Sequence, residues 1–206
     1  MHINWLGLSC FKIQTKGNTI ITDPYGDKTG LTMPKQKADV VLLSDPKNDN
    51  VNNTKRLIGD NFLIDGPGEY ELKEDYIYGL KAGETDQTGN FIFRIESEEI
   101  SLGFLGVLNH SLTDAQLETM EGVDVLFLPV SSLTSERRTK IISQIEPRIV
   151  IPMYHHIPKL KLKLENVEKF AKEMGIKNIE AQDKLILKKK DLPQEETKVI
   201  FLKNSN

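Results

Sequence analysis

The spacing of apolar residues divides this 206-residue chain into two parts of different character. In the first part, short apolar or alternating runs recur, separated by turn-forming segments such as residues 16–18 (Lys-Gly-Asn) and 65–68 (Asp-Gly-Pro-Gly). Apolar runs bounded by Gly, Pro, Asn and Asp are typical of strands joined by turns. The sequence therefore predicts strands at residues 10–13, 19–22, 40–43, 62–64, 76–78, 91–95 and 100–105.

The second part alternates helices with strands. Thr113 and Gln116 have the spacing of a capping box, which predicts a helix that runs to about residue 121. Two further amphipathic segments predict helices at residues 135–145 and 165–174, and apolar runs predict strands at residues 123–130, 148–153, 185–187 and 199–202. We find no repeat and no linker-like change of composition. The chain is therefore expected to form one mixed α/β (α+β) domain over residues 1–206, with helices covering mixed sheets.

Composition excludes several classes of protein. With 27 basic and 30 acidic side chains the formal net charge is −3, which argues against nucleic acid as the main partner. The apolar runs are far shorter than the roughly 20 residues of a membrane helix, and the N-terminal residues do not resemble a secretory signal. The single cysteine, Cys10, excludes an intramolecular disulfide and is expected to be a small buried residue. We expect a cytoplasmic protein without a membrane partner.

Six segments, in order, resemble one known family. They are residues 5–11, 20–24, 38–44, 65–71, 112–130 and 146–153. Their order and spacing are similar to those of the metallo-β-lactamase superfamily, and in particular to the branch of metal-dependent hydrolases that includes the ascorbate-6-phosphate lactonases. The resemblance covers nearly the whole chain. It implies an αββα sandwich, in which two mixed sheets lie face to face with helices outside.

The resemblance also implies where metal ligands would stand. Family members carry a His-x-His-x-Asp-His loop after the strand that here ends at Leu43, and the aligned residues 45–50 (Asp-Pro-Lys-Asn-Asp-Asn) retain only Asp49. The aspartate that bridges two metals aligns with Val107, and the late histidine aligns with Tyr154. The departures from the pattern are Asp45, Lys47, Asn50, Val107 and Tyr154, and the histidines nearby are His110, His155 and His156.

The chemistry of these side chains opposes a two-metal site. A catalytic zinc needs about three protein ligands, usually histidines with a carboxylate. The Lys47 ammonium has no lone pair and places a positive charge where a dication would sit, and Val107 offers no donor atom. The sequence therefore predicts a relative whose dinuclear site is dismantled, which carries no cofactor and is non-catalytic or binds a ligand.

Alternatives remain open at each candidate residue. A single divalent ion (Zn, Mn or Mg) held by Asp45, Asp49, His110 and His155 predicts a hydrolase of esters, lactones or phosphodiesters, with Glu69 as a possible base. Lys47 instead predicts a site for a small anionic ligand. The simplest hypothesis treats residues 45–49 as a charged surface loop, His110 as bonded to backbone, His155 as a solvated loop residue and Glu69 as part of a turn. A homo-oligomer is compatible with all of these.

Overall fold

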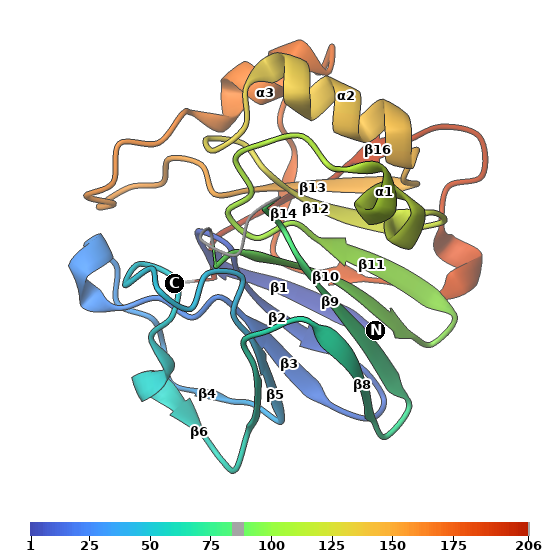
Figure 1. Cartoon of the computed structure of the whole chain (residues 1–206). Helices are drawn as coiled ribbons and strands as arrows, with labels where there is room; N and C mark the ends of the chain where they lie inside the picture. The colour runs from blue at the N-terminus through green and yellow to red at the C-terminus, as the bar shows by residue number, and fades with distance from the viewer. Residues whose placement is uncertain (84–88, 206) are drawn as a thin grey trace.

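The computed structural model describes residues 1–83 and 89–205, and it consists of two large β-sheets packed face to face (Figure 1). Both sheets mix parallel and antiparallel pairs. In spatial order, the six-stranded sheet contains β15 (Leu185–Ile186), β1 (His2–Gly7), β2 (Cys10–Gln14), β3 (Thr19–Thr22), β5 (Val40–Leu42) and β7 (Phe62–Ile64). The seven-stranded sheet contains β16 (Lys198–Val199), β13 (Ile149–Met153), β12 (Val125–Pro129), β11 (Ile100–Phe104), β10 (Phe91–Ser97), β9 (Asp75–Lys81) and β8 (Gly68–Leu72).

The main core lies between the two sheets and follows from the alternation of side chains along each strand. Ile3, Ile13, Ile20 and Val40 occupy one cross-strand row of the six-stranded sheet, and each is at most 1% exposed. The ring centroids of Phe11 and Phe127, from opposite sheets, lie 4.6 Å apart. Two sheets that each bury one apolar face in this way account for the layered arrangement.

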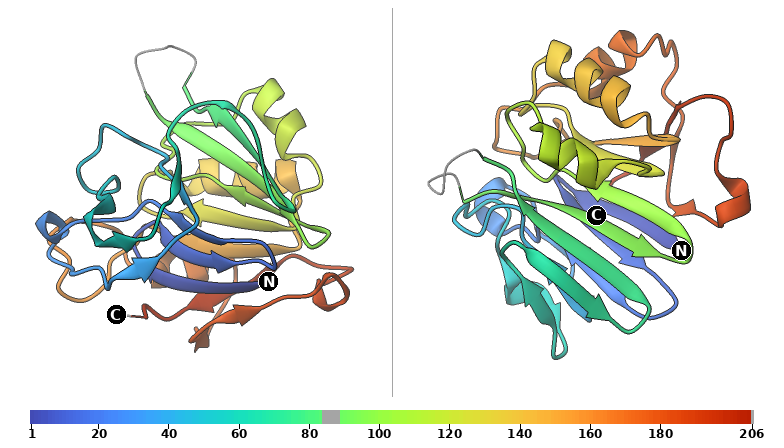
Figure 2. Two further views of the ribbon diagram at one scale, coloured as in Figure 1. Left: turned by 90° about the horizontal axis from the view of Figure 1, so that it is seen from below. Right: turned by 45° about the vertical axis from the view of Figure 1, so that its right-hand side comes forward.

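The α-helices of the described residues cover the seven-stranded sheet, as the right view of Figure 2 also shows. They are α1 (Asp114–Met120), α2 (Ser135–Ile145) and α3 (Val167–Glu173). The predicted capping box is confirmed, because the Gln116 amide donates to Thr113 Oγ1 and the Thr113 amide donates to Gln116 Oε1. The predicted bounds of α2 are confirmed, whereas α3 is shorter than the predicted 165–174.

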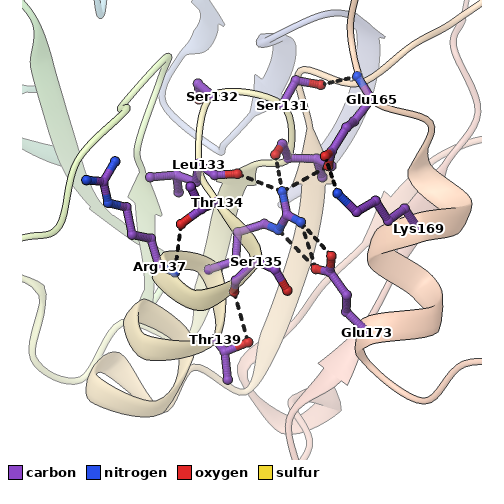
Figure 3. Close-up of polar contacts among 12 residues, drawn as sticks. Ser131, Ser132, Leu133, Thr134, Ser135, Arg137, Thr139, Glu165, Lys169 and Glu173 are labelled. Atoms are coloured by element: carbon purple, nitrogen blue, oxygen red, sulfur yellow. Dashed lines mark hydrogen bonds and ion pairs between the residues drawn. The ribbon is translucent and has the colours of Figure 1, made fainter.

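A buried guanidinium joins α2 to α3 (Figure 3). The Arg138 side chain is 1% exposed, and its Nη2 donates to both carboxylate oxygens of Glu173, at 2.7 and 2.8 Å. Its Nη1 donates to the Leu133 carbonyl at 2.7 Å, to Glu165 at 3.2 Å and to the Val130 carbonyl. A buried charge is tolerated only when it is paired and hydrogen-bonded in this manner, so these contacts fix the position of α3 on α2.

Short elements complete the fold. Two small parallel sheets pair β4 (Gln36–Lys37) with β6 (Leu57–Ile58) and β14 (Ala181–Gln182) with β17 (Phe201–Leu202), so the predicted strand 199–202 is divided between β16 and β17. The short 3₁₀ helices are η1 (Asp27–Thr29), η2 (Thr54–Arg56) and η3 (Lys189–Asp191). None of the helices within the described residues has the length and apolar character needed to cross a membrane.

Candidate functional site

Four strand ends meet at one end of the sandwich, and the backbone there adopts unusual conformations. Asp23 follows β3, Gly106 lies two residues beyond β11 and Tyr154 follows β13, while Leu8 follows β1. Their φ angles are 40°, 55°, 53° and 53°, respectively, in the left-handed region that non-glycine residues rarely adopt. The Tyr154 amide donates to the Leu8 carbonyl at 3.0 Å. Such conformations cluster where a structure holds functional side chains, so we take this end as the candidate site.

Asp23 is the buried centre of this end. Its side chain is fully enclosed, and the Ser44 amide and hydroxyl donate to its two carboxylate oxygens at 2.7 and 2.6 Å. Gly106 packs so closely on Ser44 that a Cβ at position 106 would lie 2.1 Å from the Ser44 Cβ. Asp23 therefore ties β3 to β5, and Ser44 ties this sheet to the loop after β11. Because the carboxyl group is inaccessible, it supports the site and does not face a substrate.

The pKa of Asp23 is raised from its ordinary value of 3.8 to about 7. Burial is the main cause, since it disfavours the charged form, and the nearby Asp45 carboxylate raises the pKa further. The two hydrogen bonds from Ser44 and the nearby Ser9 hydroxyl act in the opposite direction. The group therefore changes its charge near neutral pH.

Tyr154 stands where the resemblance places the late histidine. Its side chain is partly buried against the inter-sheet core. Burial raises the pKa of its phenol, and the carboxylates of Asp23 and Asp45 raise it further. The phenol is therefore protonated at neutral pH, and a protonated phenol is a poor metal ligand.

The loop 45–50 is organised by its own backbone. The Lys47 amide donates to Asp45 Oδ1 at 3.3 Å, and the Asn48 amide donates to the Asp45 carbonyl at 3.1 Å. Burial raises the pKa of Asp45. The Lys47 side chain is exposed and lies beside Gly89, since a Cβ on Gly89 would be 3.7 Å from Lys47 Nζ. Asp45 thus closes a turn, and Lys47 presents its charge to solvent.

The Asp49 carboxylate forms an ion pair with Lys28. Lys28 Nζ lies 2.6 Å from Asp49 Oδ2, and both side chains are exposed, at 75% and 68%. The hydrogen bond from Lys28 lowers the pKa of Asp49. Both residues line a shallow cavity of about 290 Å³ with residues 26–27 and 52–55. The carboxylate is therefore directed toward η1.

The histidines near the candidate site have different environments. His110 is partly buried, and its Nδ1 lies 2.9 Å from the Ser111 carbonyl oxygen. The interpretation of His155 as a solvated loop residue is wrong, because it is 7% exposed and its ring centroid lies 4.7 Å from that of Trp5. Its neighbour His156 is exposed, as expected for adjacent residues of an extended chain. Burial lowers the pKa of His155, which favours the neutral ring.

Glu69 is on a strand, not within a turn. It is an exposed residue of β8, opposite Tyr78 in the β8–β9 register, and β8 lies at the edge of the seven-stranded sheet. The predicted turn at 65–68 overlaps this strand at its first residue, Gly68. A charged side chain on an edge strand is a common protection against unwanted strand pairing.

The candidate donor groups do not converge on one point. Among residues 1–83 and 89–205, no three His, Cys, Asp or Glu side chains gather closely enough to hold one. The set Asp45, Asp49, His110 and His155 is therefore not brought together. Sequence reasoning also missed Asp23 and Ser44 as organising residues. The signal available was Asp23-Pro24 directly after an apolar strand, where a charged residue is unexpected.

Comparison with known proteins identifies the family. Residues 2–154, more than half of the chain, match the Beta-lactamase superfamily domain. The chain belongs to the beta-lactamase superfamily. A UPF0173 protein of Pyrococcus abyssi is 29% identical over 178 residues, which cover 75% of this chain and 83% of that protein.

Solved structures share the same fold. A proposed Zn-dependent hydrolase of the metallo-beta-lactamase superfamily from Thermotoga maritima is 28% identical, with a TM-score of 0.81 over 98% of this chain and 99% of that one. An isothiocyanate hydrolase from Delia radicum gut bacteria shares the fold, with 10% identity and a TM-score of 0.64 over 91% of this chain and 100% of that one. The similarity to ascorbate-6-phosphate lactonases stays a prediction.

Proposed function

We propose that this superfamily member has replaced the two-metal centre with internal contacts and binds a small anionic ligand without hydrolysing it. The observation that carries the proposal is the 2.6 Å ion pair between Lys28 and Asp49, the only aspartate retained from the family's ligand loop. A lysine ammonium at this carboxylate supplies positive charge without a metal ion.

The other former ligand positions support this proposal. Val107 offers no donor, Tyr154 keeps its proton, and His155 is stacked on Trp5. To coordinate one ion, Asp49 must leave Lys28 and His155 must leave the core. The second change is the costly one, because His155 would lose its buried packing against Trp5.

We place the proposed anion site at Lys47. Its side chain is exposed at the loop 45–50 and carries a positive charge at the end of the sandwich where the family's ligand loop aligns. The proposal is tested by calorimetric titration of inorganic phosphate into the wild type, Lys47→Ala and Lys163→Ala, an exposed lysine on a different loop. We expect Lys47→Ala to weaken binding about tenfold, and Lys163→Ala to leave it unchanged. Equal binding by all three proteins, or no binding, contradicts an anion site at Lys47.

A second candidate, a metal-dependent hydrolase, is favoured by the 28% identity to the Thermotoga maritima protein. Its test is hydrolysis of ester, lactone and phosphodiester substrates with added Zn²⁺, Mn²⁺ or Mg²⁺. A metal-dependent activity that is lost in Asp49→Ala and His110→Ala supports this candidate and contradicts the first. The cytoplasmic location stays a prediction.

A further inference from the structure

A cavity of about 410 Å³, which we call the distal cavity, lies at the end of the seven-stranded sheet that is remote from the candidate site. Its lining includes Tyr76 of β9, Glu96 of β10 and Ser101 of β11, which are neighbours in one cross-strand row. Ser101 is the second residue of β11, whereas Gly106 of the candidate site lies beyond the other end of this strand. Cavities of this size accommodate small molecules. The candidate site and the distal cavity are therefore at opposite ends of β11.

Two buried polar groups beside the distal cavity lack a hydrogen-bond partner. Ser101 is 8% exposed, and within residues 1–83 and 89–205 neither its Oγ nor the Nε of Arg94 forms a hydrogen bond. Ile95 and Leu102 belong to the core between the sheets, so the alternate residues Arg94 and Ser101 face the outer side, where the cavity lies. Buried polar groups are normally satisfied. Because the Arg94 Nε–H needs an acceptor and the Ser101 hydroxyl can donate to one, both groups suit an oxygen atom of a ligand.

Carboxylates dominate the charged lining of the distal cavity, with five of them against one guanidinium and one ammonium group. Three of the carboxylates already form ion pairs, which join Glu96 to Arg94, Glu98 to the N-terminal ammonium, and Asp124 to both Lys189 and Arg148. Glu74 and Glu99 are exposed and belong to none of the ion pairs among the described residues. These two carboxylates are therefore available to a cationic group.

Glu74 and Glu99 reach the distal cavity from two neighbouring hairpin turns. Glu74 lies between β8 and β9, Glu99 lies between β10 and β11, and the β9–β10 register puts both turns at the same end of the sheet. A bare metal ion is not favoured, because no three described His, Cys, Asp or Glu side chains gather closely enough to hold one. An organic ammonium ion can instead pair with these carboxylates while its carbon chain packs on the ring of Tyr76, which is 44% exposed.

We propose that the distal cavity binds a small organic cation that carries an ammonium group at one end and a hydroxyl or carbonyl oxygen at the other. The ammonium group pairs with Glu74 and Glu99, and the oxygen accepts hydrogen bonds from Arg94 Nε and Ser101 Oγ. Such a ligand satisfies both unpartnered groups and neutralises carboxylates that have no ion pair among the described residues. The distal cavity is independent of the anion site proposed at Lys47, because it lies at the other end of the sheet and selects the opposite charge.

The first test is an NMR titration of the ¹⁵N-labelled wild type with 4-amino-1-butanol, which has both ends, and with butylammonium and 1,4-butanediol, which each lack one end. We expect 4-amino-1-butanol to bind with a Kd of about 1 mM, and each of the other two compounds to bind about fivefold more weakly. The chemical-shift changes should concentrate at residues 74–76, 94–101 and 122–124. If 4-amino-1-butanol binds no more tightly than the other two compounds, or if the changes spread over the whole surface, the proposal is wrong.

Two variants test the two ends of the ligand separately. Glu99→Gln should weaken binding of 4-amino-1-butanol and butylammonium about fivefold and leave that of 1,4-butanediol unchanged. Ser101→Ala should weaken binding of 4-amino-1-butanol and 1,4-butanediol and leave that of butylammonium unchanged. Ser101→Ala should also keep the urea midpoint of the wild type, because its Oγ has no partner to lose among the described residues.

The matched control is Glu136→Gln, because Glu136 is an exposed glutamate of α2 that does not line the distal cavity. It should leave the binding of all three compounds unchanged. An effect of Glu136→Gln equal to that of Glu99→Gln overturns the proposal, since it would show that the ammonium group responds only to the net charge of the protein. A Ser101→Ala protein that weakens all three compounds alike overturns it as well.

Discussion

Replacing Asp23 by Asn should remove a specific pH dependence from the stability of the fold. In the unfolded chain this carboxyl ionises near pH 3.8, whereas in the folded protein its pKa is about 7. Between these values the folded state holds a proton that the unfolded state has released, so the free energy of unfolding falls as the pH rises. About three pH units separate the two pKa values, and each corresponds to about 1.36 kcal/mol. The free energy of unfolding therefore falls by about 4 kcal/mol in total, and above pH 7 it falls no further through this group.

Asparagine is suited to this test because it keeps the shape of the side chain. Its oxygen can accept from the Ser44 amide, and its NH₂ group can donate to the Ser44 hydroxyl, which then acts as the acceptor. Urea unfolding of wild type and Asp23→Asn at pH 5, 6, 7 and 8 measures the difference between them. Between pH 5 and pH 8, the free energy of unfolding of the variant should rise by about 3 kcal/mol relative to that of the wild type. If the difference in free energy of unfolding between the two proteins does not change with pH, Asp23 is not a group that titrates near pH 7.

Three further predictions concern packing and the buried histidine. Glu173→Gln removes the charge of one of the two carboxylates that contact the buried Arg138, the other being Glu165, and should lower the free energy of unfolding by about 3 kcal/mol, measured in urea. Gly106→Ala should lower it by several kcal/mol, because a Cβ there collides with a buried side chain. Gly122→Ala is the matched control, with a similar φ of 72° but open space around it, and should cost only about 1 kcal/mol; equal losses would refute the steric argument. NMR titration should give His155 a pKa below its ordinary 6.5, so that stability falls as the pH drops below that value; a midpoint above 6.5 contradicts its placement in the core.

The elements that the sequence predicted well are those whose signals are local. The capping pair Thr113 and Gln116 and the apolar spacing of residues 135–145 are read within one helix, and both are confirmed. β8 was missed because its residues are exposed or only partly buried, and no apolar run marks it. β4 and β6 have two residues each, which is too short for any periodicity.

The candidate site was less predictable because its contacts join residues distant in the chain. The pairing of Asp49 with Lys28 spans 21 positions, and nothing local to either residue announces it. The ring of His155 is buried against Trp5, which lies about 150 positions earlier in the chain. The family resemblance predicted which positions to consider as site residues, whereas the partners of their side chains could be found only from the fold.

The central proposal is that the residues aligned with the family's ligand positions do not bind a metal ion tightly. The most direct measurement is elemental analysis of untagged protein that has been incubated with Zn²⁺, Mn²⁺, Fe²⁺ and Mg²⁺ and then desalted, with Asp49→Ala/His110→Ala treated in parallel. We predict less than about a tenth of an equivalent of each of the tightly held ions, Zn²⁺, Mn²⁺ and Fe²⁺, and the same content in both proteins. One or more equivalents in the wild type, lost in the double variant, would contradict the account.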